Sequence, residues 1–82
     1  MPTVLVKGNL RVAFASKECP EPPHVHAIFG RAQAKFWLEP AIELDENHGL
    51  ARRQLRAARS LITERRSDCI PAWWRHCPPI GV

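Results

Sequence analysis

The feature that most constrains the fold is a stretch of alternating apolar and polar residues on either side of Gly30-Arg31. When residues 24–29 pair with residues 32–38 across a two-residue turn, the two faces of the hairpin separate by polarity. One face carries Val25, Ala27, Phe29, Ala32, Ala34, Phe36 and Leu38, and the other carries His24, His26, Ile28, Gln33, Lys35 and Trp37. A slip of one residue would mix the faces, so the pattern predicts both the hairpin and its register. We expect the apolar face to lie against the core and the mixed face to stay largely open.

The rest of the chain predicts a second hairpin and one helix. Residues 3–7 and 10–15 are apolar or β-branched runs separated by Gly8-Asn9, a dipeptide suited to a tight turn. The segment 40–49 is the most acidic part of the chain and indicates a connection between the second hairpin and the helix, with at most a short strand or turn at 41–44. From Ala51 onward apolar residues recur every three or four positions, which predicts an amphipathic helix of about five turns that ends before Pro71.

These elements predict an α+β fold. We expect one domain over residues 1–82, with two β-hairpins forming a mainly antiparallel sheet packed against one C-terminal amphipathic helix. Residues 71–82 are predicted to be an irregular C-terminal tail that folds back through its two tryptophans. A chain of 82 residues has room for one modest core. A hydrophobic fraction of 45% and a charged fraction of 24% are ordinary for a globular protein and argue against disorder.

The sequence also favours a cytoplasmic protein. It contains no apolar run close to the roughly 18 residues that cross a bilayer, and its N-terminus does not resemble a secretory signal. Its three cysteines, Cys19, Cys69 and Cys77, form no CxxC pair, so we expect free thiols rather than a disulfide framework or a standard zinc site. His76, adjacent to Cys77, has poor chelating geometry in sequence and is expected to be structural or incidental.

Charge is concentrated in the C-terminal third. The net charge is +4, of which residues 1–50 contribute −1 and residues 51–82 contribute +5. Four arginines, Arg52, Arg56, Arg59 and Arg66, fall on one face of the predicted helix, where guanidinium groups could bind phosphate or carboxylate. The arrangement predicts either a nucleic-acid-binding or partner-binding surface or a solvated helix face.

The most site-like pattern is the pair His24 and His26. Alternate residues of a strand point the same way, so these side chains would lie about 7 Å apart. With Lys35 opposite, they could serve as general acid, general base and anion stabiliser around an RNA phosphate. The pair could also bind Zn²⁺ or another divalent transition metal, although a stable zinc site needs a third ligand, such as Glu21 or Cys19. The alternative is a hydrogen-bonded surface pair without chemistry.

The mixed face could also bind a partner protein. Trp37 would stack on a base or fill an interface pocket, unless the tail covers it. Gln33 and Glu21 accompany it as candidate partner-binding residues.

Several motifs together resemble a known family. The segments are Met1-Pro2-Thr3-Val4, Glu21-Pro22-Pro23-His24-Val25-His26, Ala34-Lys35-Phe36-Trp37-Leu38, Pro40, Asn47, Gly49 and Ala72-Trp73. They are similar to the bacterial domain-of-unknown-function family 4160 over nearly the whole chain. The chain departs from the family pattern at Ala51 and Gln54, where relatives tend to have a capping Ser and a Glu, and also at residues 69–71 and after Trp74.

The resemblance implies no established activity. It implies a small bacterial protein, often encoded beside another small protein in an arrangement like that of toxin–antitoxin pairs. The leading hypothesis is therefore a cytoplasmic interaction module that binds a protein partner, which an adjacent gene could encode, and also nucleic acid, with no cofactor and no membrane contact. The alternatives are a metal-independent ribonuclease that uses His24, His26 and Lys35, and a metal-binding regulator.

Overall fold

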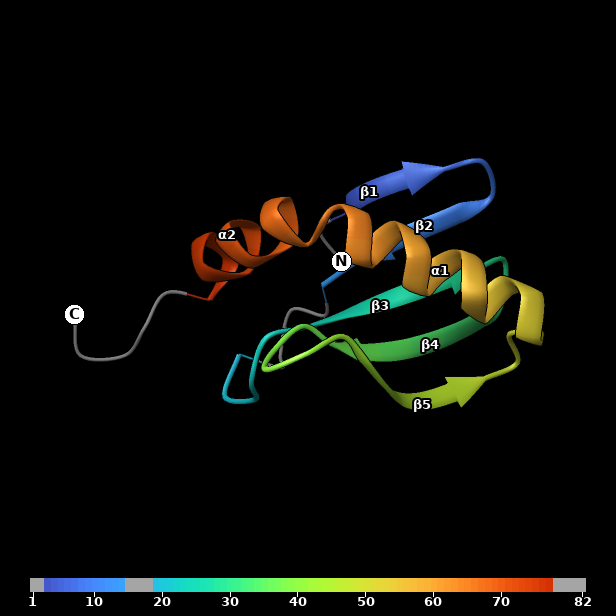
Figure 1. The fold of residues 1–82 in the computed structure, drawn as a ribbon, viewed down its shortest axis with the longest axis horizontal. Helices are drawn as coiled ribbons and strands as arrows, with labels where there is room; N and C mark the ends of the chain where they lie inside the picture. Colours follow the sequence, from blue (N-terminus) through green and yellow to red (C-terminus); the bar gives the residue numbers. More distant parts are fainter. Residues whose placement is uncertain (1–2, 15–18, 78–82) are drawn as a thin grey trace.

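The computed structural model describes residues 3–14 and 19–77, and it has the expected α+β class (Figure 1). The elements in chain order are β1 (Thr3–Lys7), β2 (Leu10–Ala13), β3 (His24–Phe29), β4 (Ala32–Trp37), β5 (Glu43–His48), α1 (Arg52–Glu64) and α2 (Arg66–His76). The strands form one five-stranded antiparallel sheet in the order β1-β2-β3-β4-β5. The predicted antiparallel sheet is confirmed, with one strand more than expected.

The central hairpin has the predicted register. His24 pairs with Trp37, His26 with Lys35, and Phe29 with Ala32 across the turn. Gly30 has a φ of 56°, a left-handed conformation in which a residue with a side chain would be strained. The first hairpin also has its predicted turn, with Lys7 paired to Leu10, while its predicted end at residue 15 lies outside the described residues.

The core lies between the apolar face of the sheet and the two helices. In Figure 1, α1 lies across one face of the sheet and α2 extends past the end of the strands. The buried hydrophobic cluster draws on β2, β3, β4 and both helices, and consists of Leu10, Val12, Phe14, Val25, Ala27, Ala34, Phe36, Leu38, Leu50, Ala58, Leu61, Ile62, Cys69, Trp73 and Cys77. The predicted packing of the helix on the apolar face of the second hairpin is therefore confirmed.

The prediction that residues 40–49 form a connection is wrong, because Glu43–His48 is a full strand paired with β4. All six of its residues are exposed, so the sequence has no alternation of apolar and polar residues that would predict the strand. The strand lies at the sheet edge, where acidic side chains limit pairing with other chains. Its backbone pairing with β4, rather than burial, accounts for its formation.

The single-helix prediction is also wrong. The helix breaks at Arg65, and a second helix continues through Pro71 to His76. A proline inside a helix costs about 3 kcal/mol, but the continued helix buries Trp73 to 1% exposure. Residues 71–76 are thus helical rather than an irregular tail, and residues 78–82 lie outside the described part of the chain.

Candidate functional site

The sequence predicted that His24 lies on an open face of the sheet. This prediction is wrong, because the His24 side chain is completely buried. Its ring lies 4.9 Å from the ring of Trp73, which α2 brings over the start of β3, and 5.5 Å from that of Trp37. The Nδ1 of His24 donates to the carbonyl oxygen of Pro22 at 2.9 Å. These contacts are typical of a structural histidine that joins the loop before β3 to the sheet.

The two imidazoles are nevertheless neighbours, as predicted. Their ring centroids lie 5.4 Å apart and the rings are nearly perpendicular, at 79°. His26 is half-buried. Because no atom of His24 reaches the surface, the pair cannot flank a phosphate in this conformation, and the geometry does not favour the ribonuclease hypothesis.

Lys35 is held by acidic side chains on both sides. Its Nζ lies 2.6 Å from Oε1 of Glu21 and 3.6 Å from Oδ2 of Asp45, and it lies 4.4 Å above the Trp37 ring. The lysine side chain is 12% exposed. Its positive charge is therefore already compensated within the protein, which fits a link between the loop before β3 and strand β5.

Two of the three predicted partner-binding residues lie near each other, around Lys35. Glu21 is bound to Lys35, and Gln33 is exposed on β4 opposite His48 of β5. Trp37 is half-buried and lines a hollow with Pro22, Glu39, Pro40 and Glu43. The structure brings Trp37, Lys35 and Glu21 together but places Gln33 farther along the strand.

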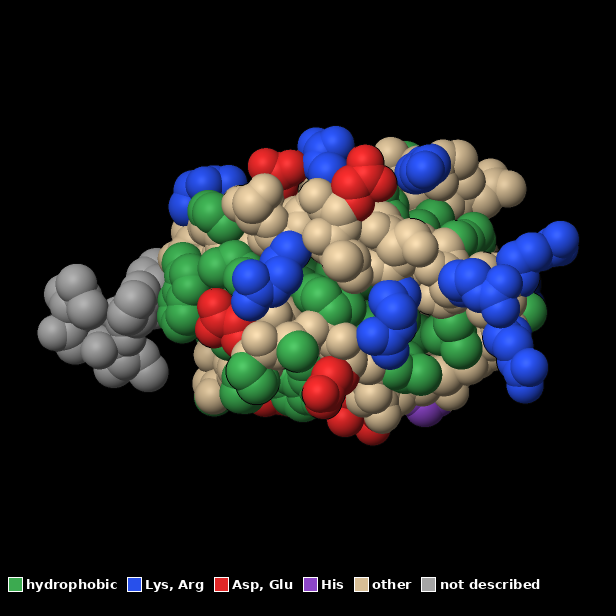
Figure 2. All heavy atoms as spheres, in the orientation of Figure 1, with side chains coloured by type: hydrophobic (Ala, Val, Ile, Leu, Met, Phe, Trp, Pro, Cys, Tyr) green, Lys and Arg blue, Asp and Glu red, His purple; other side chains and the backbone are tan. Residues whose placement is uncertain are grey.

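Three of the four predicted arginines do come together. Arg52, Arg56 and Arg59 line a groove between α1 and the β4–β5 edge, together with Phe36, Leu44 and Leu55. Arg59 donates from Nη1 to the carbonyl oxygen of Ile42 at 2.9 Å, and its guanidinium lies 5.7 Å from the Phe36 ring. Figure 2 shows this side of the molecule, with Lys and Arg side chains around hydrophobic surface.

Arg66 does not belong to this groove. The break at Arg65 places it in α2, where it is half-buried and its Nε donates to the carbonyl oxygen of Leu38 at 3.1 Å. The four arginines therefore do not form the one continuous face that was predicted. Arg52, Arg56 and Arg59 form one group, and Arg66 has a separate structural role. A surface formed by Arg52, Arg56 and Arg59, hereafter the arginine groove, is the part available to a ligand.

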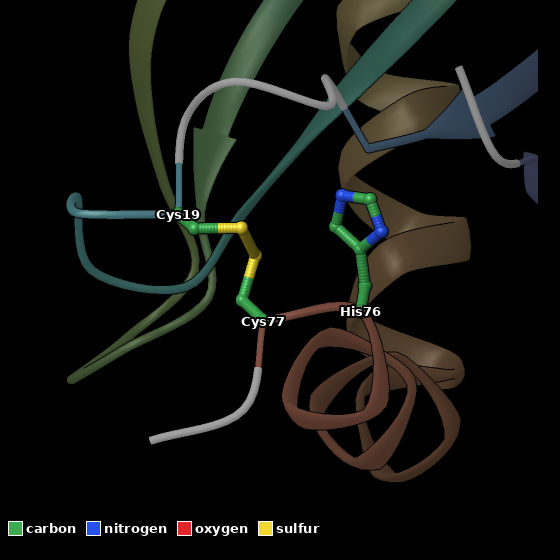
Figure 3. A group of neighbouring side chains, drawn as sticks. All are labelled: Cys19, His76 and Cys77. Carbon is green, nitrogen blue, oxygen red and sulfur yellow. A yellow bond between two sulfur atoms is a disulfide. The ribbon is translucent and has the colours of Figure 1, made fainter. Parts of the chain in front are cut away.

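The structure also contains a cysteine–histidine cluster that the sequence did not predict. Cys19 and Cys77 form a disulfide, so the prediction of three free thiols is wrong, and only Cys69 is a free cysteine among the described residues. His76 lies beside the disulfide (Figure 3). The sequence contains only a weak signal for this cluster, because the three residues come together only when α2 continues past Pro71. The same continuity brings Trp73 to His24.

The predicted metal pair is not part of this cluster. Among the described residues, the ligand-type side chains that lie close enough to hold one ion are Cys19, His76 and Cys77, and neither His24 nor His26 is in that group. Cys69 is buried in the core, and burial together with nearby Asp68 raises the pKa of its thiol, while Arg65 lowers it less. This thiol is therefore protonated and unreactive near neutral pH.

Comparison with known proteins bears on the family rather than on the activity. Within the described residues, neither helix has the length and continuous hydrophobicity needed to span a bilayer. No curated protein and no solved structure matches the chain. A family model described as a domain of unknown function (DUF4160) matches residues 9–74, from the turn before β2 to the last turn of α2, and the chain therefore belongs to the DUF4160 family.

Proposed function

We propose that this chain is a small protein-binding module whose arginine groove receives a partner segment rich in acidic and apolar residues. The observation that carries the proposal is the composition of the groove, in which three guanidinium groups surround an apolar floor. Leu44 on this floor is 39% exposed although it is a large hydrophobic residue. Apolar surface rimmed by charge is typical of interaction sites.

The position of the groove supports the same conclusion. The helix α1 leaves edge strand β5 uncovered, so Leu44 and Leu55 meet solvent at the boundary between the helix and the sheet. A partner segment lying there would bury apolar side chains on Leu44 and place carboxylates against Arg52 and Arg56. Arginine forms bidentate hydrogen bonds with carboxylates, which would fix the orientation of the segment.

A second candidate ligand is nucleic acid, favoured by the exposure of Arg52, Arg56 and Arg59 on successive turns of α1. Single-stranded nucleic acid usually also stacks on exposed aromatic rings. The aromatic residue in this groove, Phe36, is only 1% exposed. We therefore favour a protein partner, which in a bacterial two-gene module of the toxin–antitoxin type would be encoded by the adjacent gene and would meet this chain in the cytoplasm.

The enzymatic and metal hypotheses for His24, His26 and Lys35 remain predictions with less support. A ribonuclease would need the buried His24 to reach its substrate, and a metal at the pair would need ligands beyond the two imidazoles. The contacts of His24 and Lys35 support a structural role for this part of the sheet.

A peptide-display selection with a random library tests the proposed ligand chemistry whatever the identity of the partner. We expect enrichment of peptides that combine Asp or Glu with apolar residues. Arg56→Glu should weaken binding of an enriched peptide at least about tenfold, because it replaces attraction by repulsion in the groove. Arg53→Glu is the matched control. This substitution makes the same change of charge on α1, but Arg53 does not line the groove.

The outcomes separate the two ligands. Equal losses in Arg53→Glu and Arg56→Glu would show a general charge effect and contradict a groove. If no peptide is enriched but single-stranded RNA binds with a steep dependence on salt, nucleic acid is the ligand and the protein-binding proposal is wrong.

A further inference from the structure

The cysteine–histidine cluster joins two parts of the chain that are distant in sequence. Cys19 lies in the loop before β3, while His76 and Cys77 lie at the end of α2. The two sulfur atoms and a ring nitrogen of His76 all lie within 4.8 Å of one another. Figure 3 shows the disulfide bridging the loop and the helix end, with the imidazole to one side. The geometry thus gathers two potential thiolates and one imidazole at a single point.

The imidazole has an unsatisfied atom. The Nε2 of His76 is buried and has no hydrogen-bond partner among the described residues. A buried polar atom without a partner typically costs about 1–3 kcal/mol, so native structures rarely leave one without a role. The ring is also held in place, because it stacks on Phe14 with centroids 5.4 Å apart and an angle of 24°. An oriented imidazole with an unused nitrogen is a suitable metal ligand.

We propose that reduction of the Cys19–Cys77 disulfide converts this cluster into a binding site for one Zn²⁺ ion, held by Cys19, Cys77 and His76. The same residues would then have two states, an oxidised state closed by the disulfide and a reduced state closed by the metal. This inference is independent of the arginine groove, which lies on another part of the molecule. It also differs from the predicted metal pair at His24 and His26.

The change in geometry that the conversion needs is small. In tetrahedral coordination with Zn–S bonds near 2.3 Å, two thiolate sulfurs lie about 3.8 Å apart. The Cα atoms of Cys19 and Cys77 are 5.3 Å apart, so rotation of the two cysteine side chains can place their sulfurs at this separation. Three protein ligands leave a fourth position for water or an external ligand.

The chemical step is a thiol–disulfide exchange followed by metal binding. A dithiol reductant attacks the sulfur of Cys19, which is an exposed residue, the Cys19–Cys77 bond breaks, and the reductant leaves as its own disulfide. Two protons and two electrons pass to the protein, giving two thiols. Binding of Zn²⁺ then displaces one proton from each thiol to solvent, and the neutral imidazole donates its lone pair without losing a proton.

Titration of the full-length protein with Co²⁺, a spectroscopic substitute for Zn²⁺, tests the proposal. After reduction and removal of the reductant without oxygen, we expect thiolate-to-cobalt charge-transfer and tetrahedral ligand-field bands that saturate at one equivalent and disappear when Zn²⁺ is added. The oxidised protein should show neither band. His76→Phe keeps a ring against Phe14 and both cysteines, and it should lower the affinity at least about tenfold through the loss of one ligand.

Two further variants serve as controls for the titration. His48→Phe removes an exposed imidazole from β5, and Cys69→Ser removes the buried thiol, so both should bind Co²⁺ like the wild type. Circular dichroism in the reduced state checks that the chain is folded. The proposal is wrong if the reduced protein, whether folded or not, gives no tetrahedral cobalt spectrum. It is also wrong if His76→Phe binds Co²⁺ as tightly as the wild type, or if the oxidised protein binds Co²⁺ as well as the reduced protein does.

Discussion

His24 shows how one residue can be placed correctly on a strand and still have the wrong environment. Its strand, register and cross-strand partner Trp37 follow from the alternation in the sequence. Its burial does not, because the cover comes from Trp73, in a helical segment beyond the proline that was predicted to end the helix. A polar side chain in a small domain can thus be a core residue when it has a hydrogen-bond partner and an aromatic neighbour.

The different environments of the two histidines predict different effects of mutation. His24→Ala should lower the free energy of unfolding by about 2–4 kcal/mol, because it leaves a cavity beside Trp73 and leaves the Pro22 carbonyl oxygen unpaired. His26→Ala, at a half-buried position, should cost less than about 1 kcal/mol. Urea unfolding of both variants measures the difference. Similar losses for the two would contradict the structural role of His24.

Cys69 predicts a specific dependence of stability on pH. Its thiol has a pKa raised above the usual 9.0, mainly by burial. As pH rises past 9.0 the unfolded chain loses this proton first, so the unfolded state binds fewer protons and the protein loses stability, by up to about 1.4 kcal/mol per pH unit. The stability advantage of the wild type over Cys69→Ala should therefore be constant below pH 8 and shrink above pH 9. Thermal unfolding across this range measures it, and a constant difference would refute the assignment.

At the level of elements, prediction succeeded where burial produces a pattern. The central hairpin was predicted with its register because one face is entirely apolar. Strand β5 was missed because it is exposed along its length and depends on backbone pairing alone. The helix α2 was missed because local rules stop a helix before Pro71, and the burial of Trp73 overrides them.

The connection from β5 to α1 explains two residues that carried the family resemblance. Asn47 accepts a hydrogen bond from the Leu50 N–H and donates one to the Leu50 carbonyl oxygen, each at 3.0 Å. Gly49 has a φ of 103°, and a Cβ there would lie 3.1 Å from the Cβ of Ala32. These residues therefore shape the turn before α1, and they give no indication of chemistry.

The start of α1 has half of a capping box. The Gln54 side chain accepts a hydrogen bond from the Ala51 N–H at 2.9 Å, but the Ala51 methyl group cannot accept one in return. Ala51→Ser adds the missing acceptor and should raise the free energy of unfolding by about 0.5–1 kcal/mol. Ala57→Ser is the control, because at an exposed position within α1 serine should lower stability slightly. Chemical denaturation compares them, and equal effects would contradict the cap.

At the scale of the whole molecule, the sites depend on contacts that no local pattern contains. The excess positive charge after residue 50 predicted a basic surface, and Arg52, Arg56 and Arg59 form it. Three cysteines allow three different pairings, so the sequence could not select Cys19 with Cys77. That choice depends on α2 passing the loop before β3, which in turn depends on the packing of Trp73 against Phe14 and His24.

The disulfide closes a loop that contains β3, β4, β5 and both helices, because its cysteines are 58 residues apart in sequence. A crosslink over a loop of this length restricts the unfolded chain and should stabilise the protein by about 2–4 kcal/mol. Replacing both Cys19 and Cys77 with serine should therefore lower the midpoint of urea unfolding, and adding a reductant to the metal-free wild type should have the same effect. The Cys69→Ser protein keeps the crosslink, so its midpoint should still fall on reduction. Because the sheet and α1 bury most of the core, the reduced chain should remain folded in water. A midpoint unaffected by reductant would show that the crosslink is not formed in solution.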